Sequence, residues 1–438
     1  MNRAVSVVII LCVASMAACI SCTRQQEKDN VTVAFQYFKP SQDEIDFLSR
    51  FNVVVTDKFL DAEAVKLLKS RKVKLIHYEW LPASYYCADH TGWEEMVYQN
   101  RNYWTLDPAE SDPNPMGDRY GCLDLFYDMA ADDMLSARID HIVAEIQTHQ
   151  YDGVFFDWGS GWYAFQEYNY QFLMKEFQKR HPGIDYNEKA NEFLGKLKEK
   201  KLLIMVNGGF RSDGSKMDTY ADFDVVESMF TTTDCKKSYE LYTPIEGLRK
   251  SCETTFNTTE ASVNLASSLP AKARSVNHGI RFVFLNYAYP FFKETGKKVR
   301  IDSQEFSVYS KAADRQAIYY DLACSYLGDS SGFVSGPEVS LDSVMDNIYF
   351  SPIGKAEGAA KKIKDDAYLR YFSQGLVVIS QDDATIEVTL PGSISRVFDL
   401  YEGKYQNVKD NKLVANLVSQ IYPSGSKHPV GRIYKYEH

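Results

Sequence analysis

Two acidic residues stand at points where short apolar segments end. Asp157 follows Val154-Phe155-Phe156, and Glu227 follows Val225-Val226. Two carboxyl groups that face one another can supply a proton donor and a nucleophile or base. The apolar setting of Glu227 is expected to raise its pKa and to keep it protonated. Each residue also has a structural interpretation, Asp157 as a helix cap or salt-bridge partner and Glu227 as a buried acid paired with a Lys or Arg.

Polar and aromatic residues occupy the ends of the other apolar segments. A ring of such groups suits a hydroxyl-rich ligand, because Tyr and Trp offer flat apolar faces beside polar atoms. Glu79 could also serve as an alternative carboxylate partner for Asp157, and each polar residue could instead be a satisfied core group. The predicted ligand-binding residues are Tyr37, Asp57, Glu79, Trp80, Trp158, Trp162, Asn207, Asn286 and Tyr287.

The elements that would position these residues alternate between short apolar runs and longer helical patterns. This alternation predicts eight βα units over residues 31–372, a (β/α)8 (TIM) barrel. The predicted strands are 31–35, 53–55, 74–78, 151–158, 202–207, 223–227, 281–286 and 331–335, and a helix is expected around 306–326. In such a barrel the site lies at the carboxyl ends of the strands. A doubly wound sheet is disfavoured, since Gln36-Tyr37-Phe38-Lys39-Pro40 follows the first strand where a glycine-rich turn would be expected.

Two further regions flank this alternating pattern. Residues 81–132 form a long insertion rich in Tyr, Trp, Asp and Pro, and its aromatic content argues against disorder. Residues 373–438 contain short alternating strands between turns, which predicts a small C-terminal all-β domain.

The N-terminus has the features of an export signal. Residues 1–22 contain Arg3 and an apolar run that is too short for a comfortable membrane span, and the polar linker 23–30 follows. The pattern resembles a bacterial lipoprotein signal lipidated at Cys19, with Cys22 as the alternative. A plain signal peptide or an uncleaved anchor remains open. The resemblance implies an exported protein of the bacterial cell envelope, held at the membrane by a lipid.

The remaining cysteines suggest disulfides, because export makes them possible. Cys87 could pair with Cys122 across one long loop, and Cys235 with Cys252 across another, whereas Cys324 lies in a helical pattern and is expected to be a buried free thiol. Among these remaining cysteines, no CxxC or His-rich spacing indicates a metal site, and no cofactor is expected.

Charge narrows the range of partners. The chain has a formal net charge of -10 and no block of Lys and Arg interleaved with aromatics. Nucleic acid is therefore an unexpected ligand, since phosphate recognition generally needs a basic face. The oligomeric state is left open by the sequence.

The segment Asp152-Gly153-Val154-Phe155-Phe156-Asp157, together with Glu227, carries a family resemblance. It is similar to the glycoside-hydrolase-like TIM barrels related to endo-α-1,4-polygalactosaminidases and, more remotely, to the α-galactosidase clan. The resemblance implies that Asp157 is the nucleophile after strand four and Glu227 the acid/base after strand six. Residues 371–378 and 398–404 look like the start of the β domain in such proteins.

The chain departs from this family in two places, the insertion after strand three and Val377-Val378-Ile379-Ser380, where related chains tend to carry Asn-Pro. The leading hypothesis is a glycoside hydrolase of retaining type acting on an extracellular poly- or oligosaccharide, with an inverting separation of the carboxyls still open. Two alternatives are a non-catalytic glycan-binding lipoprotein and a metal-dependent hydrolase, the latter disfavoured because clustered His residues are lacking. The sugar and linkage do not follow from the sequence.

Overall fold

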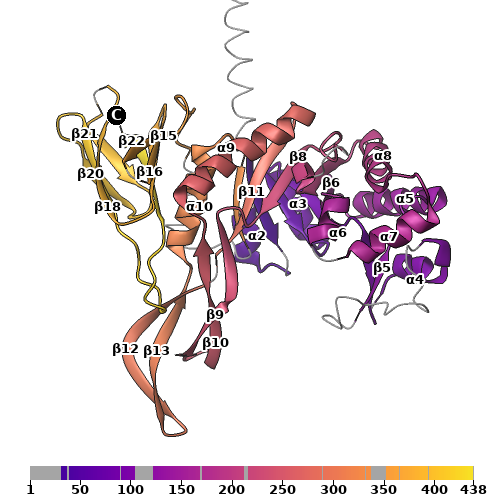
Figure 1. Ribbon diagram of the computed structural model, residues 1–438, viewed down its shortest axis with the longest axis horizontal. Helices are drawn as coiled ribbons and strands as arrows, with labels where there is room; N and C mark the ends of the chain where they lie inside the picture. The colour runs from indigo at the N-terminus through magenta and orange to yellow at the C-terminus, as the bar shows by residue number, and fades with distance from the viewer. Residues whose placement is uncertain are drawn as a thin grey trace, which may run out of the picture.

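A parallel barrel forms the body of the protein in the computed structural model (Figure 1). The structure describes residues 31–437 apart from 37–38, 89, 104–121, 168–169, 212–215, 289, 331, 337–351, 365 and 393. The barrel strands are β1 (Val31–Gln36), β2 (Val53–Thr56), β3 (Lys74–Trp80), β6 (Gly153–Asp157), β7 (Leu203–Asn207), β8 (Phe223–Glu227), β11 (Arg281–Tyr287) and β14 (Gly332–Gly336). Because β1 pairs in parallel with both β2 and β14, the sheet closes on itself. The strands predicted from the sequence are these eight, in the predicted order.

Helices follow most of these strands. They are α2 (Gln42–Leu48), α3 (Ala62–Ser70), α5 (Asp132–Thr148), α6 (Trp162–Glu167), α7 (Gln171–Arg180), α8 (Tyr186–Glu199), α9 (Thr259–Val276) and α10 (Arg315–Leu327). The connection from β7 to β8 differs, since its described residues form only the short 3-10 helix η2 (Gly209–Arg211). The prediction of a complete (β/α)8 repeat is therefore wrong at this unit. Its residues are rich in Gly, Ser and Asp, which favour turns over helix, and Gly208 has a φ of +73°.

Side chains alternate between the barrel interior and the helical layer. Phe35, Val55, Phe155, Val225 and Leu285 belong to the interior cluster. Their neighbours in sequence, among them Ala34, Val54, Phe156, Val226 and Phe284, pack outward in the larger core shared with the helices. Burial on both faces explains why the strands are continuous apolar runs in the sequence.

The insertion after β3 is partly regular. It contains β4 (Ala83–Tyr86), α4 (Gly92–Gln99), the 3-10 helix η1 (Arg101–Tyr103) and β5 (Leu123–Phe126), and β4 pairs with β5. The predicted disulfide between Cys87 and Cys122 is present. Arg138, which is 1% exposed, donates to the backbone oxygens of Leu81 at 2.7 Å and Trp80 at 2.8 Å. The insertion is thereby held to α5 and to the end of β3.

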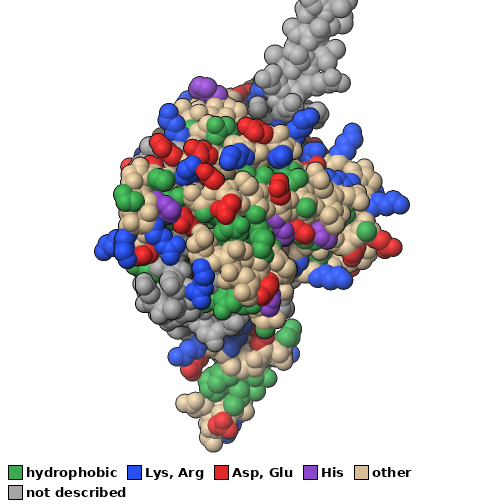
Figure 2. Space-filling model, turned by 90° about the vertical axis from the view of Figure 1, so that its right-hand side faces the viewer, with side chains coloured by type: hydrophobic (Ala, Val, Ile, Leu, Met, Phe, Trp, Pro, Cys, Tyr) green, Lys and Arg blue, Asp and Glu red, His purple; other side chains and the backbone are tan. Residues whose placement is uncertain are grey.

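Two long antiparallel hairpins follow β8 and β11 and join through a parallel contact between β9 and β13 to form a four-stranded arm below the barrel (Figure 1). They are β9 (Thr231–Thr243) with β10 (Gly247–Phe256), and β12 (Phe291–Ile301) with β13 (Gln304–Ala312). The helix expected around 306–326 is wrong over its first turns, because β13 pairs with β12 and α10 begins only at Arg315. Seen from the side in Figure 2, the arm extends below the body and carries a patch of apolar side chains.

Cysteines outside the insertion partly match the predictions. Cys252 is disulfide-bonded, and its predicted partner Cys235 lies in the section of β9 whose side chains are outside the described residues. Cys324 is a buried free thiol, as predicted.

The C-terminal β domain begins earlier than predicted. Its main sheet has the order β15 (Lys361–Lys364), β16 (Ala367–Phe372), β17 (Gly375–Ser380), β22 (Val430–Glu437), β19 (Arg396–Asp399) and β20 (Lys404–Asn407), and β18 (Ala384–Thr389) pairs with β21 (Lys412–Leu417). Because β16 forms a hairpin with β17 and β15 pairs with β16, the boundary predicted at residue 373 cuts through this hairpin.

Arg370 joins this domain to the barrel. Its guanidinium, on β16, donates to the backbone oxygens of Tyr326, Leu327 and Gly328 at the end of α10. The side chain is only 8% exposed. A helix end leaves its last carbonyl groups without intrahelical partners. Arg370 therefore caps a barrel helix from a separate domain.

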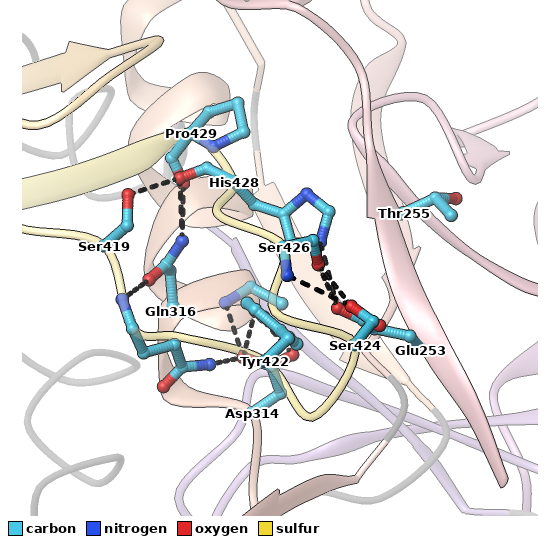
Figure 3. A network of polar contacts seen from close by, with 12 residues as sticks. Glu253, Thr255, Asp314, Gln316, Ser419, Tyr422, Ser424, Ser426, His428 and Pro429 are labelled. Carbon is cyan, nitrogen blue, oxygen red and sulfur yellow. Dashed lines mark hydrogen bonds and ion pairs between the residues drawn. The ribbon is translucent and has the colours of Figure 1, made fainter. Parts of the chain in front are cut away.

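The loop after β21 makes a second connection between the domains (Figure 3). Asp314, which precedes α10 and is 2% exposed, accepts hydrogen bonds from Tyr422 and from the Gln420 amide at 2.7 Å. Gln316 donates to the backbone oxygens of His428 at 3.0 Å and Pro429 at 3.1 Å. The two domains are thus joined by buried polar contacts.

The predicted signal segment 1–22, the linker 23–30 and both candidate lipidation cysteines, Cys19 and Cys22, lie outside the described residues. Among the residues that are described, no helix has the length and apolar character needed to cross a membrane.

Replacing Arg370 with Met should lower the free energy of unfolding by about 3 kcal/mol, because buried carbonyl groups at the end of α10 lose a charged donor. Chemical denaturation monitored by circular dichroism measures this change. Lys404→Gln is the control, since Lys404 is exposed and pairs only with the neighbouring Glu402. Equal stability of the two variants would contradict the capping role of Arg370.

Candidate functional site

Asp157 lies at the mouth of the barrel, at the end of β6. It continues the inward-facing series of Gly153 and Phe155. Its Oδ2 accepts a hydrogen bond from the Tyr78 hydroxyl at 2.6 Å, and its Oδ1 accepts from Asn207 Nδ2 at 2.8 Å and from the Trp158 backbone N–H at 2.8 Å. Donors on both oxygens fix the rotamer of the carboxyl group and suit its ionised form, which has only acceptors.

Glu227 faces Asp157 from the end of β8. Burial and the negative charge of Asp157 raise the pKa of Glu227 to about 8, although hydrogen bonds from Tyr287 and Asn207 and the charge of Arg211 act in the opposite direction. At neutral pH Glu227 is therefore mostly protonated and can donate a proton.

Asn207 connects the two acids. It ends β7, the strand that lies between β6 and β8 in the barrel. Its amide donates to Asp157 and also hydrogen-bonds to Glu227. One small side chain thus holds both carboxyls, which requires them to lie close together.

A left-handed residue follows each of these three polar groups. The φ angles are +57° at Trp158, +73° at Gly208 and +56° at Ser228. For residues other than glycine this conformation costs about 1 kcal/mol. The chain therefore turns sharply away from the barrel immediately after each polar side chain.

Arg211 is the cation at this edge of the mouth. It lies in η2 and forms an ion pair with Glu167 of α6 at 2.6 Å. Its guanidinium carbon also lies 5.4 Å from the ring centroid of Tyr163, which is 40% exposed. A charged and aromatic rim thus borders the two acids beside α6.

Three predicted residues face away from the mouth. Glu79 alternates with the inward Tyr78, so it points into the layer between β3 and the insertion, where burial raises its pKa to about 7. Asn286 is fully buried and accepts from the Phe230 backbone N–H at 2.9 Å. Trp162 stacks on Tyr186 at 4.6 Å between α6 and α8. The structure thus places these three side chains away from the mouth, because a position near the end of a strand, as for Glu79 and Asn286, does not decide which face the side chain occupies.

The other predicted residues lie around the rim. Trp80 and Trp158 pack edge to face at 5.2 Å, and both are largely buried, at 5% and 9% exposure. Their ring faces are therefore largely covered and do not offer an open surface on which a sugar ring could stack. Asp57 is half-buried at the inward position after Val55, and Tyr37 lies outside the described residues.

Tyr78 and Arg211 were not among the residues predicted from the sequence. Tyr78 could have been found by counting alternate residues from Ile76, which belongs to the barrel interior. Arg211 carries no such signal, because it lies in an irregular connection whose course is set by tertiary contacts.

A second group of residues combines a serine, a histidine and a carboxylate (Figure 3). Ser426 Oγ and Glu253 Oε1 both approach the same ring nitrogen of His428, Nε2, at 3.1 and 3.3 Å, and Ser426 itself donates to Glu253. A nucleophilic triad instead needs the serine and the acid on opposite ring nitrogens. With the ring of His428 stacked on Phe256 at 4.6 Å, this group fastens the C-terminal loop to β10.

Within the described residues, no group of three or more His, Cys, Asp and Glu side chains is placed to hold a metal ion.

Replacing Asp157 with Asn should lower the pKa of Glu227 below about 8, because the negative charge that opposes ionisation of Glu227 is removed. NMR titration of protein labelled with ¹³C at glutamate carboxyls, with Glu227→Gln to assign the signal, measures the shift.

Asp140→Asn is the matched control for this titration, since Asp140 is exposed on α5 and the variant loses the same charge. An unchanged Glu227 pKa in the Asp157 variant would show that the two acids do not interact.

No protein-family model matches the chain, and no curated protein matches it by sequence. Several solved structures are similar. The glycoside hydrolase domain of PelA from Pseudomonas aeruginosa is 18% identical, with a TM-score of 0.38, and the match covers 58% of this chain and 83% of that one. The alpha-amylase from Geobacillus thermoleovorans, complexed with acarbose, is 12% identical with a TM-score of 0.45, covering 94% and 99%. The maltogenic alpha-amylase AmyB from Thermotoga neapolitana is 8% identical with a TM-score of 0.47, also covering 94% and 99%.

Proposed function

We propose that the protein is a glycoside hydrolase of retaining type that acts on an extracellular oligo- or polysaccharide. The observation that carries this proposal is the pair Asp157 and Glu227, held by one asparagine, with Asp157 surrounded by donors and Glu227 kept protonated. Retaining enzymes need their two carboxyls about 5–5.5 Å apart, and inverting enzymes need more room for a water molecule. Contact of both acids with Asn207 favours the shorter separation.

In the first step, Glu227 gives its proton to the glycosidic oxygen while an oxygen of Asp157 attacks the anomeric carbon. The bond to the leaving sugar breaks, and a covalent glycosyl ester forms on Asp157. Tyr78 and Asn207 hold the Asp157 carboxyl in place during this attack.

In the second step, Glu227 acts as the base. The ester on Asp157 carries no negative charge, so one cause of the raised pKa of Glu227 is removed once the ester has formed. The Glu227 carboxylate takes a proton from water, the water oxygen attacks the anomeric carbon, and Asp157 is released. The charge of Asp157 thus favours a protonated Glu227 in the first step, and the loss of that charge in the ester favours an ionised Glu227 in the second.

The proposed location is the bacterial cell envelope. The apolar run that precedes Cys19, or alternatively Cys22, supports export and lipid anchoring. A substrate outside the cell is consistent with the disulfide between Cys87 and Cys122, since disulfides persist in oxidising compartments.

Asp157→Asn should abolish hydrolysis, because the amide cannot form the ester, and Glu227→Gln should slow it by roughly 10²–10⁴-fold through loss of the proton donor. A panel of bacterial exopolysaccharides and host glycans, assayed for new reducing ends, supplies the substrate. Added azide should restore turnover in Glu227→Ala and yield a glycosyl azide of retained configuration.

Glu79→Gln is the control in this assay, since Glu79 also lies near the end of a barrel strand but faces outward. Full activity in Asp157→Asn would contradict the proposed mechanism. Binding without hydrolysis by the wild-type protein would support a glycan-binding role instead.

The rate should also depend on pH through Glu227. The proton donor is lost as pH rises through its pKa of about 8, so kcat/KM should fall about tenfold per pH unit above that value. The Glu227→Gln variant should still hydrolyse substrates whose leaving groups need no protonation. Its kcat/KM for these substrates should not decline above pH 8. If kcat/KM of the variant falls at alkaline pH as that of the wild type does, the decline belongs to a group other than Glu227.

A further inference from the structure

The barrel rim opposite the mouth carries the turns that lead into the barrel strands. Because these strands are parallel, all such turns lie together at the amino-terminal ends. The turns before β3, β6 and β7 are neighbours there, since the Asp152 N–H donates to the Leu75 oxygen at 2.7 Å and the Leu203 N–H donates to the Asp152 oxygen at 3.0 Å. The basal face is the arc of this rim formed by residues 71–73, 149–152 and 200–202.

The acids at this rim are already paired with cations of the fold. Asp152 forms ion pairs with Lys69 and with Lys74, whose Nζ lies at 3.2 Å from Oδ1. Asp222, in the neighbouring turn before β8, is paired with Lys198 at 2.6 Å. These two carboxylates therefore do not neutralise the other basic residues of the basal face.

Exposed cations on the basal face have no ion pair within the part of the chain that the structure describes. They are Arg71, Lys72, Lys200 and Lys201. The chain as a whole has a formal net charge of -10, so a group of unpaired positive charges runs against its average composition. An acidic protein with one basic face is attracted to an anionic surface through that face only.

Two of these lysines occupy a backbone position that favours glycine. Lys72 and Lys201 are each the second residue after a helix, α3 and α8, with φ angles of +64° and +66°. Their N–H groups donate back to the oxygens of Lys69 and Lys198 at 2.9 Å, as in helix-ending turns whose left-handed residue is commonly glycine. Attraction to the helix dipole is already supplied by Lys69 and Lys198 in the last turns. The stability of the fold therefore does not explain lysine at 72 and 201, where a left-handed side chain costs about 1 kcal/mol.

The chain that would come from a lipid anchor enters the barrel at this same rim. Val31 begins β1, and the linker 23–30 separates it from Cys22. At about 3.5 Å per residue, the segment from Cys19 to Val31 spans at most roughly 45 Å. The mouth lies at the opposite rim, about 20 Å away along the strands, and the arm extends beyond it by roughly the 35 Å of the strand β12. The segment is therefore too short for the mouth and the arm to face the membrane that holds the anchor.

We propose that the basal face rests on an anionic lipid surface, with Arg71, Lys72, Lys200 and Lys201 against the phosphate groups while the mouth and the arm point away. The observation that carries this proposal is unpaired positive charge on the rim where the chain enters. Basic residues beside a lipid anchor add to membrane affinity, because a single acyl chain binds only marginally and each charge contributes separately. The outward mouth rests on the proposed location and function, whereas lipid binding by the face can be measured without an anchor or a substrate.

Vesicle binding by the chain without its anchor tests the face itself. Residues 23–438 contain every described element and neither candidate lipidation cysteine. Vesicles of phosphatidylglycerol and phosphatidylcholine in equal parts are the probe, and pure phosphatidylcholine vesicles are the neutral reference. In cosedimentation at low ionic strength the protein should bind the anionic vesicles only, and about 0.5 M NaCl should release it, because salt screens the attraction. Equal binding to both kinds of vesicle, or none to the anionic ones, would overturn the proposal.

The double variant Lys72→Gly, Lys201→Gly is the informative one, because glycine suits the left-handed backbone and removes two charges without strain. Its melting temperature should equal or exceed that of the wild type. Its affinity for the anionic vesicles should fall by roughly 25-fold, since each basic residue near such a surface contributes about fivefold. Wild-type affinity in this variant would contradict the role given to the basal face.

Two matched controls separate charge from backbone and from position. Gln150→Gly makes the same backbone change without losing a charge, since Gln150 is exposed in the third turn of the basal face with a φ of +59°. Lys293→Gln with Lys297→Gln removes two charges from exposed positions on the arm. Both controls should bind the vesicles as the wild type does. A loss in the arm variant as large as that in the Lys72 and Lys201 variant would place the contact elsewhere and overturn the proposal.

The orientation has a measurement of its own. Acetylation of lysine side chains on vesicle-bound protein, read by mass spectrometry, should be slowed at Lys72, Lys200 and Lys201 and unchanged at Lys293 and Lys297. Protection of the two arm lysines instead would show the mouth facing the lipid and overturn the proposal. Binding to soluble dextran sulfate without binding to vesicles would assign the face to a soluble polyanion, with the same consequence.

These outcomes are independent of the glycosidase assay. Full activity in Asp157→Asn would remove the proposed function and leave the vesicle result standing. Conversely, failure to bind vesicles would remove the basal contact and leave the pair Asp157 and Glu227 untouched, because both acids lie at the opposite rim.

Discussion

The site depends on the repulsion between two carboxyl groups that face each other in a poorly hydrated mouth. Since both cannot be ionised at low energetic cost, the proton must stay on one of them, and the surroundings decide which. Asp157 has a donor from the strand on each side, Tyr78 and Asn207, and one from its own following residue. At Glu227, burial and the charge of Asp157 outweigh the hydrogen bonds from Tyr287 and Asn207, so Glu227 keeps the proton. The proton that the proposed mechanism requires on Glu227 is therefore already present before any ligand arrives.

The sequence was sufficient to predict the barrel strands and the two acids because both depend on local patterns. Continuous apolar runs are the signature of strands buried on both faces, and Asp157 and Glu227 interrupt such runs at their carboxyl ends. The disulfide between Cys87 and Cys122 followed from the expectation of export and from their positions in one loop. What failed was the assignment of faces. Glu79 and Asn286 lie beside Tyr78 and Tyr287, and one position along a strand moves a side chain from the mouth to the helical layer.

Other features were beyond the sequence because they depend on contacts between distant segments. The arm consists of hairpins with many exposed Lys, Glu and Thr side chains, so β12 and β13 lack the apolar runs that revealed the barrel strands. Arg370 caps α10 across a domain boundary, and nothing near it in the sequence indicates this role. Likewise, η2 owes its course to Asp224, which comes later in the chain and belongs to the next strand.

The left-handed residues after the three polar strand ends show how the strain at the mouth is supported. Each strained residue has its own N–H bound to a fixed acceptor. Trp158 donates to the Asp157 carboxylate at 2.8 Å, Gly208 to the Val225 oxygen at 2.7 Å and Ser228 to the Leu285 oxygen at 2.8 Å. A conformation that costs about 1 kcal/mol persists only where neighbouring structure determines it. At Trp158 the acceptor is Asp157 itself, so the strained turn and the orientation of the Asp157 carboxyl stabilise one another. At Gly208 and Ser228 the acceptors belong to the next strand of the barrel, so closure of the sheet, rather than any local preference of the chain, keeps Asn207 and Glu227 aimed at Asp157.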